Sequence, residues 1–255
     1  MPLATAHTRC DGAAPHSSCN RRANDFWFRS TSFDAKLLRK MKLIGQFDSP
    51  FVRRVGIALR FYAMPFEHVP WSVFRDAELI ARYNPLRRVP TLVLDDGRVL
   101  TETLVCLDFL DEEFTTGNVG SSERLLLPQS GPLRSEVLRL SALAGGAADK
   151  AVSLAYEREV RENQSKNWVE RCTKQVHECL DCLESERASR KSTFLFGERI
   201  SHADIAMTCV YTFVTSAHPG FLAPEQLPAL RAHAERCEAM SEFSSVFQPF
   251  DIPKS

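Results

Sequence analysis

The segment "KLIGQFDSPFVRRVGIAL", Lys42–Leu59, joins a strand pattern to a helix pattern through a serine followed by a proline. Its first six residues form a short apolar run that predicts a strand. Pro50 suits the first turn of a helix, where a missing N–H has no partner to lose. The following apolar positions recur at helical spacing: Val52, Val55, Leu59 and Tyr62. This stretch therefore predicts a strand, a tight turn and a helix.

Further short elements follow before residue 115. They are a strand at "FEHVPW" (66–71), a helix over 76–82, a strand at "PTLVL" (90–94), a turn at "DDGR" (95–98), a strand at "VL" (99–100) and a helix over 101–114. The last helix spaces its apolar residues at helical intervals: Leu104, Leu107, Leu110 and Phe114. The two strands around "DDGR" predict a hairpin. The predicted order for residues 41–114 is β-α-β-α-β-β-α.

The rest of the chain has a different texture. Residues 115–122, "TTGNVGSS", have the composition of a linker. Helix-period apolar positions then fill four stretches: Leu133–Val160, Asn167–Arg187, Ala203–Thr215 and Pro228–Phe243. Convincing strand alternation is missing from these stretches. We therefore predict an α/β domain over 41–114 and an all-helical C-terminal domain over 123–255.

Composition excludes several classes of protein. The chain of 255 residues has 32 basic and 32 acidic side chains and no net charge, which argues against nucleic-acid or anionic-membrane partners. No apolar stretch approaches the ~20 residues that span a bilayer. Eight cysteines are far below the density of a disulfide scaffold, and no secretory segment precedes them. We expect a cytoplasmic protein in a reducing compartment.

Residues 1–40 show no sustained periodicity and mix Pro, Ser, Asn and Arg. They predict a disordered extension, or a stretch upstream of a natural start at Met41. A transit peptide is a weaker alternative, because the segment contains acidic residues and lacks an amphipathic stripe.

The nearest approach to a metal signature is a cluster of Cys172, His177, Cys179 and Cys182. However, Cys172, Val176, Cys179 and Leu183 also follow the spacing of one apolar helix face, and free cysteine packs as a small hydrophobe. A zinc site would need a second ligand pair at suitable spacing, and none is present in the sequence. We therefore predict no metal.

Three stretches carry a family resemblance: "DSPFVRRVGIAL" (48–59), "NPLRRVPTLVLDDGRVLTET" (84–103) and "FGERISHADIAM" (196–207). With the α/β half placed before the helical half, the chain from Met41 onward resembles the cytosolic glutathione S-transferases. The resemblance implies a thioredoxin-like N-terminal domain, a cis Val89–Pro90 bond and glutathione as cosubstrate. It also implies a homodimer in which the α/β half of one subunit meets the helical half of the other.

The resemblance assigns the γ-glutamyl end of glutathione to Glu102 and Thr103. Thr103 begins a predicted helix, whose free N–H groups and positive end favour a carboxylate. Glu102 would pair with the ammonium group. The alternative is that residues 101–103 only cap the helix.

The rest of the tripeptide is assigned to the loop before Pro90. Val89, held extended before the proline, would offer its backbone N–H and C=O to the cysteinyl residue. Arg88 would hold the glycyl carboxylate. Arg87 stands where the family often has glycine, and a solvated arginine pair is the alternative reading of these two residues.

Ser49 occupies the turn where the resemblance places the catalytic group. A hydroxyl that donates to sulfur, at the positive end of a helix, lowers the pKa of a thiol. The alternative is that Ser49 caps the helix that Pro50 begins; both roles together would require two rotamers. Oxygen in place of sulfur excludes a mixed disulfide here. Pro50 and Phe51 replace the serine and cysteine of the maleylacetoacetate-isomerising classes, which argues against that activity.

We expect the electrophile pocket between the two halves, lined by Phe51, Trp71, Phe74 and Tyr156. Ser201 and Asp204 have capping-box spacing, so removing either should cost about 1 kcal/mol and leave the chemistry unchanged. We expect His202 to be exposed.

The leading functional hypothesis is a detoxifying glutathione transferase that acts on a small apolar electrophile. The second is a glutathione-binding regulatory protein with little turnover. The third is a thiol reductase, which would require Cys106 to reach the site; its place one helical turn after Glu102 points it into the core instead.

Overall fold

The computed structural model describes residues 41–117 and 124–251. The expectations for residues 1–40 and for most of the 115–122 linker lie outside these residues. Four strands form one sheet in the order β2-β1-β3-β4: β1 (Met41–Ile44), β2 (Phe66–Val69), β3 (Thr91–Val93) and β4 (Val99–Thr101). β1 pairs parallel with β2 and antiparallel with β3, and β3 and β4 form the predicted hairpin.

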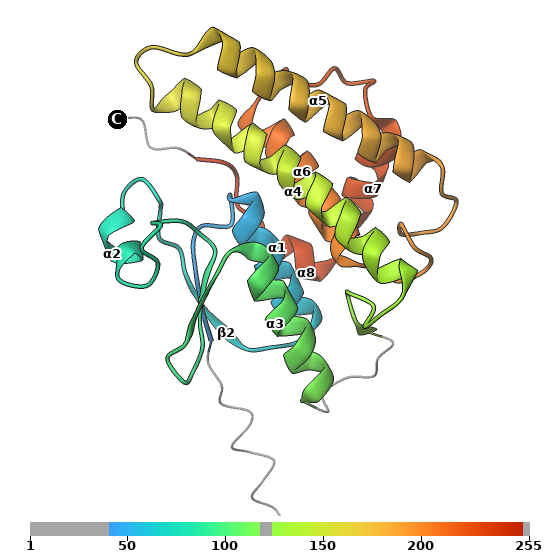
Figure 1. The fold of residues 1–255 in the computed structure, drawn as a ribbon. Coiled ribbons are helices and arrows are strands. Elements are labelled where there is room, and N and C mark those ends of the chain that lie inside the picture. Colours follow the sequence, from blue (N-terminus) through green and yellow to red (C-terminus); the bar gives the residue numbers. More distant parts are fainter. Residues whose placement is uncertain (1–40, 118–123, 252–255) are drawn as a thin grey trace, which may run out of the picture. The chain divides into compact units, whose positions relative to one another are not determined.

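Three helices accompany the sheet: α1 (Pro50–Phe61), α2 (Ala77–Ala81) and α3 (Thr103–Thr116). α1 and α3 lie on one face of the sheet and α2 on the other side (Figure 1). The element order confirms the predicted thioredoxin-like β-α-β-α-β-β-α domain. The predicted stripe of α1 is confirmed as well, since Val52, Val55 and Leu59 are fully buried.

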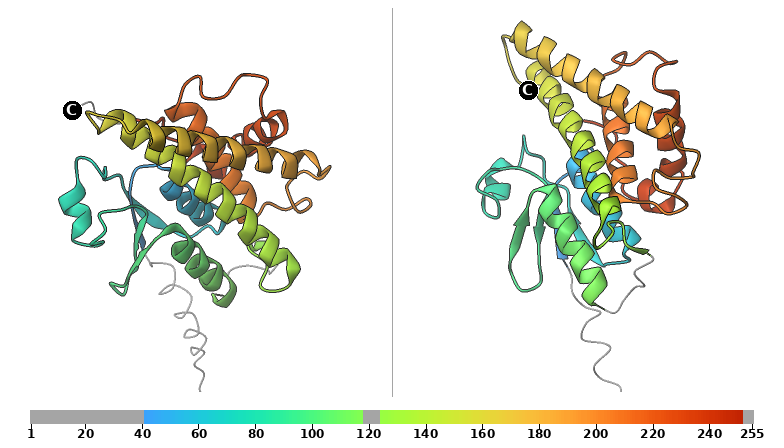
Figure 2. Two further views of the ribbon diagram at one scale, coloured as in Figure 1. Left: turned by 45° about the horizontal axis from the view of Figure 1, so that its top comes forward. Right: turned by 45° about the vertical axis from the view of Figure 1, so that its right-hand side comes forward.

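The second half is helical, as predicted. It contains α4 (Pro132–Glu159), α5 (Lys166–Ala188), α6 (His202–Ala217), α7 (Pro228–Glu238) and α8 (Ser241–Ser244) (Figure 2). The stretch Pro228–Phe243 is helical in two parts, α7 and α8. Met240 adopts an extended backbone with ψ 144°, which separates α7 from α8. The resulting turn carries Phe243 into the core, where it packs edge-on against Phe61.

The apolar core of the α/β half continues into the helical half. The cluster that contains the α1 stripe also contains Ile205 and Cys209 of α6 and Cys237 of α7. Arg53 on α1 forms a bidentate ion pair with Glu238 of α7, with N–O distances of 2.7 and 2.5 Å. The two halves therefore share buried apolar surface and a largely buried ion pair.

The apolar residues that α3 spaces at helical intervals are not all buried. Leu104 is 53% exposed, whereas Cys106, Leu107 and Leu110 are buried. The side of α3 that carries Cys106 and Leu110 faces the sheet. Leu104 lies on another side of the helix and therefore outside the core. The expectation that Cys106 points into the core is confirmed.

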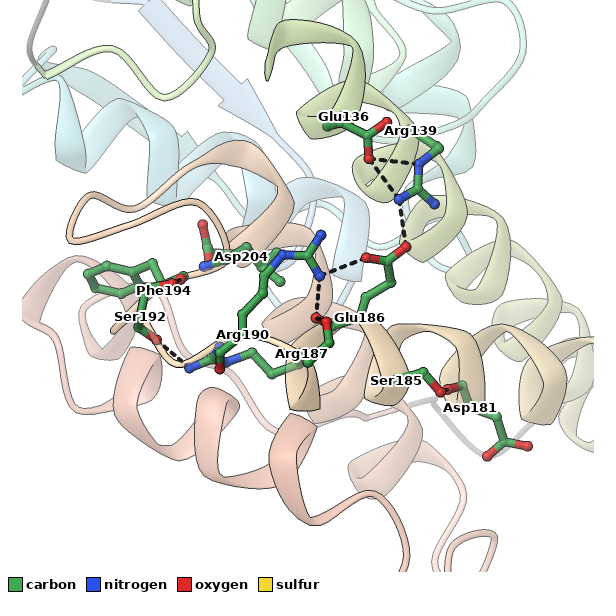
Figure 3. Close-up of polar contacts among 12 residues, drawn as sticks. Glu136, Arg139, Asp181, Ser185, Glu186, Arg187, Arg190, Ser192, Phe194 and Asp204 are labelled. Atoms are coloured by element: carbon green, nitrogen blue, oxygen red, sulfur yellow. Dashed lines mark hydrogen bonds and ion pairs between the residues drawn. The ribbon is translucent and has the colours of Figure 1, made fainter. Parts of the chain in front are cut away.

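A chain of ion pairs joins α4 to the end of α5 (Figure 3). Arg139 of α4 lies 2.8 Å from Glu136 and 2.6 Å from Glu186 of α5, and Glu186 also pairs with Arg190 at 2.7 Å. Arg139 and Arg190 hold the carboxylate of Glu186, whose pKa is lowered chiefly by the hydrogen bond from Arg139.

The cysteines of α5 do not converge on a metal geometry. Cys172 is buried in the helical core, and the ring of His177 stacks on Phe221 with 4.4 Å between centroids. In residues 41–117 and 124–251, no group of three or more His, Cys, Asp or Glu residues is placed to hold a metal ion. None of the helices described is long and apolar enough to cross a bilayer.

The capping box of α6 is confirmed. Oδ2 of Asp204 accepts hydrogen bonds from the Ser201 N–H at 2.8 Å and from the Ser201 hydroxyl at 2.6 Å. The prediction that His202 is exposed is wrong, because it is only 4% exposed. Its Nε2 lies 3.0 Å from both carboxylate oxygens of Asp111, which also accepts a hydrogen bond from Tyr62. The first turn of α6 is buried against α3, so a polar residue there needs an internal partner.

Candidate functional site

A close approach of three segments forms the floor of the site. Gly45 ends β1 with φ 128°, a value that favours glycine. A Cβ added to Gly45 would lie 2.5 Å from Cγ2 of Val52 and 2.8 Å from Cβ of Val89. Glycine at this position therefore lets the end of β1, the start of α1 and the loop before Pro90 meet.

Ser49 is the N-cap of α1. Its Oγ accepts a hydrogen bond from the Val52 N–H at 3.4 Å, and Pro50 occupies the first turn as predicted. Ser49 also lines a cavity of about 540 Å³ between the two halves. A hydroxyl has one donor and two acceptor lone pairs, so Oγ can accept from Val52 while its own hydrogen points elsewhere. A single rotamer is therefore compatible with both roles, contrary to the expectation that two are needed.

The loop before β3 has the backbone that the resemblance implies. The Val89–Pro90 bond is cis, as expected. Asn84, buried beneath the loop, donates to the Arg88 carbonyl at 2.9 Å and accepts from the Leu86 N–H at 3.0 Å. Within the part of the chain described, the backbone N–H and C=O of Val89 have no hydrogen-bond partner. These two groups are therefore free to bind a ligand in strand-like fashion.

Arg87 adopts φ 52°, in the left-handed region that glycine prefers. The loop thus keeps a glycine-like conformation although the residue is arginine. Arg87 pairs with Glu78 at 3.1 Å on the surface, and its neighbour Arg88 lies 3.6 Å from Glu102.

Glu102 and Thr103 stand at the start of α3. Glu102 is the N-cap residue with φ 70° and ψ 136°, and its side chain makes no capping hydrogen bond. The alternative that residues 101–103 only cap the helix therefore has no support from the side chain of the N-cap residue. Thr103 is buried at the first helical position. Because Thr91 pairs with Thr101 across the hairpin, Glu102 lies beside Pro90 at the end of the ladder.

The structure gathers most of the candidate residues around the cavity that Ser49 lines. Its lining includes Ser49, Phe51, Trp71, Phe74, Arg88, Val89 and Tyr156. Pro90, Glu102 and Thr103 do not line it; they adjoin it through Val89 and Arg88. Phe74 and Tyr156 approach from opposite halves, with 5.1 Å between ring centroids. This cavity has an aromatic wall on one side and the polar loop of Arg88 on the other.

Sequence patterns missed other lining residues: Asp48, Trp168, Phe213, Phe250 and Asp251. Trp168 lies in α5 and Phe213 in α6, while Phe250 follows the last helix and packs on Phe213 with 5.3 Å between centroids. The spacing of residues along the chain cannot predict that these side chains, which come from different helices and from the C-terminal segment, line the same cavity. Asp48 could have been found, because it directly precedes Ser49.

Asp48 is a partly buried carboxylate at the edge of the cavity. Burial raises its pKa from 3.8 to about 6, although hydrogen bonds from the backbones of Asp251 and Ser49 oppose the shift. The Asp251 N–H donates to Asp48 Oδ2 at 3.4 Å, and the Asp251 carboxylate adds a like charge.

Replacing Asp48 with asparagine should raise the free energy of unfolding at pH 7.5 by about 1–2 kcal/mol. An acid whose pKa is raised by folding favours the folded state below its unfolded pKa, and this advantage is lost as the pH rises through about 6. The stabilisation by Asp48→Asn should therefore disappear toward pH 4. Urea unfolding at both pH values measures it, with exposed Asp181→Asn on α5 as the matched control. Equal effects of the two substitutions would contradict the burial of this charge.

Two family profiles match the sequence. The profile described as glutathione S-transferase, N-terminal domain, matches residues 48–113, and that described as glutathione S-transferase, C-terminal domain, matches residues 166–236. Together the two matched stretches span more than half of the chain.

Curated relatives and solved structures agree with the profiles. Glutathione S-transferase U8 of Arabidopsis thaliana is 28% identical over 167 residues, which cover 65% of this chain and 68% of that protein. The uncharacterized GST-like protein YibF of Escherichia coli K12 is 28% identical over 176 residues, which cover 68% of this chain and 82% of that protein.

A glutathione S-transferase from Methylobacillus flagellatus KT, solved with glutathione bound, superposes with a TM-score of 0.72 and 27% identity. The alignment covers 81% of this chain and 98% of that one. A glutathione transferase family member from Pseudomonas fluorescens Pf-5, with bound glutathione, gives a TM-score of 0.70 and 26% identity over 83% of this chain and 100% of that one. The chain therefore belongs to the glutathione S-transferase family.

Proposed function

We propose that this protein is a glutathione transferase that joins the sulfur of glutathione to a small apolar electrophile. The observation that carries the proposal is the position of Ser49. Its hydroxyl stands at the N-terminus of α1, on the wall of a cavity that also contains Val89, Arg88 and an aromatic face. A thiol held there would meet a hydrogen-bond donor and the positive end of a helix, and both favour the thiolate.

Glutathione is proposed to lie along the loop before Pro90. The unpaired backbone of Val89 would bind the cysteinyl residue, and Arg88 would hold the glycyl carboxylate. The free N–H groups at the start of α3 would hold the γ-glutamyl carboxylate beside Thr103. Glu102, 3.6 Å from Arg88, would turn to the ammonium group. This arrangement places the thiol toward Ser49.

The electrophile is proposed to bind against the aromatic wall of the same cavity. Phe51, Trp71, Phe74 and Tyr156 supply apolar surface, and the lining residues Trp168 and Phe213 extend it. Such a surface favours an apolar or aromatic compound through burial and ring stacking. The attack then forms a carbon–sulfur bond and releases the leaving group of the electrophile.

The reductase alternative has little support. Cys106 is fully buried, its thiol lies 3.8 Å from the carbonyl of Leu100, and burial raises its pKa to about 12. A protonated thiol inside the core cannot attack a mixed disulfide in the cavity.

The regulatory alternative predicts glutathione binding without turnover. Calorimetric titration of the purified full-length chain with glutathione, followed by an assay with a general aryl halide, separates the two functions. We expect binding and turnover, because the cavity is lined both by the polar loop of Arg88 and by aromatic side chains that suit an apolar electrophile. Binding with no turnover on a panel of aryl halides and epoxides would favour the regulatory function. Absence of binding would contradict both.

We also propose a homodimer in the cytoplasm, where glutathione is available. Leu104 and Val105 on α3 and Leu138 on α4 are exposed, so an apolar surface runs from the α/β half to the helical half. Burial of this surface against a second subunit would be favourable. The six described cysteines are free, which fits a reducing compartment.

A further inference from the structure

A second cavity, of about 330 Å³, lies away from Ser49. Its walls come from α1, α3, α4 and the start of α6, and α1 lies beside both α3 and α4 (Figure 2). Its lining includes Arg54, Leu104, Val105, Asp108, Ser141 and His202. None of these residues lines the cavity proposed for glutathione.

Arg54 is the unusual member of this lining. It is 4% exposed, and its Nε and Nη2 have no hydrogen-bond partner. In residues 41–117 and 124–251, no acidic side chain forms an ion pair with it. Its neighbour Arg53 has Glu238 as a partner, so the two adjacent arginines differ sharply.

A buried guanidinium without a counter-ion is destabilising, because the charge loses its hydration and gains no partner in exchange. Burial lowers the pKa of Arg54 to about 10, so the group stays charged at neutral pH. Gly145 of α4 leaves room for it: a Cβ there would lie 3.3 Å from Nη1. The fold thus accommodates the Arg54 guanidinium in the core and leaves its positive charge without a counter-ion.

Two further polar atoms around the same cavity lack partners. Oγ of Ser141 and Nδ1 of His202 are both buried and make no hydrogen bond. Ser141 offers a hydroxyl donor. Nε2 of His202 donates to the Asp111 carboxylate, so Nδ1 of the neutral ring is an acceptor. The Arg54 guanidinium and the Ser141 hydroxyl together match the acceptor oxygens of a carboxylate.

Neither acidic residue of the lining supplies that carboxylate from within the chain. Asp111 is already held by Tyr62 and His202. The Asp108 side chain is 73% exposed and makes only a long contact with Arg134, at 3.7 Å. It projects from the rim, next to the exposed apolar residues Leu104 and Val105.

The mouth of this cavity combines an exposed carboxylate and an apolar border with an unpaired guanidinium buried behind them. In a two-fold symmetric dimer the same patch faces itself, so each carboxylate can meet the arginine of the other subunit. Two equivalent contacts would then form at once, and the apolar border would exclude water from both.

We propose that the cavity beside Arg54 is a carboxylate-binding site that is completed by Asp108 of a second copy of this chain. The inference gives a residue-level basis to the proposed homodimer and does not depend on glutathione chemistry. A turnover assay and an association measurement can therefore fail independently.

Sedimentation equilibrium of the full-length chain at neutral pH tests the proposal. The wild-type protein should be a dimer, and Asp108→Asn should weaken dimerisation by about a hundredfold, because two charge contacts are lost per dimer. Arg54→Met, which fills the site with an apolar side chain, should weaken it as well. The double variant should dimerise no more weakly than whichever single variant has the lower dimer affinity, because the two substitutions remove the same interaction.

Two controls sharpen the result. Glu170→Gln, on an exposed part of α5, should leave the dimer unchanged. Arg134→Gln tests whether Asp108 acts only through its contact with Arg134. Asp108 is exposed, so its substitution should leave the fold intact. The Asp108→Asn measurement therefore tests the proposal even if Arg54→Met fails to fold.

Several outcomes would overturn the proposal. These are a monomeric wild-type protein, a dimer that Asp108→Asn does not weaken, or an Arg134→Gln variant that weakens the dimer as much as Asp108→Asn. A monomer whose melting temperature rises with millimolar sulfate or acetate, and no longer does so in Arg54→Met, would assign the site to a free anion instead.

Discussion

Replacing Asp204 with alanine is expected to lower the free energy of unfolding by about 3–5 kcal/mol. The side chain is completely buried at the start of α6. Oδ1 accepts a hydrogen bond from the Leu195 N–H at 2.8 Å, and Oδ2 accepts two from Ser201. Alanine would leave these donors buried without partners, and it would leave a cavity as well. The loss therefore exceeds the ~1 kcal/mol expected for a helix cap alone.

Ser201→Ala is the matched control for this prediction. It removes one hydroxyl and keeps the contacts of Asp204 with the backbone of Leu195 and Ser201, so it should cost about 1 kcal/mol. Urea unfolding followed by circular dichroism compares the two variants, and the slope of the transition should not change. If Asp204→Ala lost no more stability than Ser201→Ala, the carboxylate would be only a local cap. Neither change touches the cavity of Ser49, so glutathione binding should persist in the folded fraction.

Local pattern was sufficient for the elements that position the site. The run before Gly45, the proline at the start of α1 and the "DDGR" turn each restrict the backbone within a few residues. The strand and helix order of the α/β half therefore follows from the sequence. The four helical stretches follow too, because their apolar periodicity is sustained.

Faces and partners could not be predicted in the same way. Leu104 and Cys106 both fit an apolar stripe of α3, and only the position of the sheet decides that Cys106 is buried. His202 is covered because α6 packs on α3 through Asp111, a partner 91 residues away along the chain. The same limit applies to the cavity wall, because Phe250 and Ser49 line one cavity only after every helix has been placed.

Replacing Ser49 with alanine should lower kcat/KM for an aryl halide by about 10- to 100-fold at pH 6.5. A free thiol with a pKa near 8.5 is only about 1% ionised at that pH, so the reaction depends on a thiolate that the enzyme stabilises. Without the hydroxyl, that stabilisation shrinks to the contribution of the α1 N-terminus. The deficit should narrow above about pH 8.5, where the free thiol ionises unaided.

A second substitution separates the hydroxyl from the cap. Ser49→Ala also removes the acceptor of the Val52 N–H and should cost about 1 kcal/mol of stability, whereas Ser49→Gly costs only a few tenths. If the hydroxyl stabilises the thiolate, both variants lose the same rate and the same ultraviolet thiolate absorbance, although their stabilities differ. If Ser49 is only a cap, Ser49→Gly keeps wild-type rates at every pH. The cap contact, at 3.4 Å, is long for an N–H···O bond, so the oxygen is not committed to the helix alone. If both variants lose rate because the hydroxyl is missing, and the loss does not depend on their stabilities, then Ser49 is the group that promotes ionisation of the glutathione thiol.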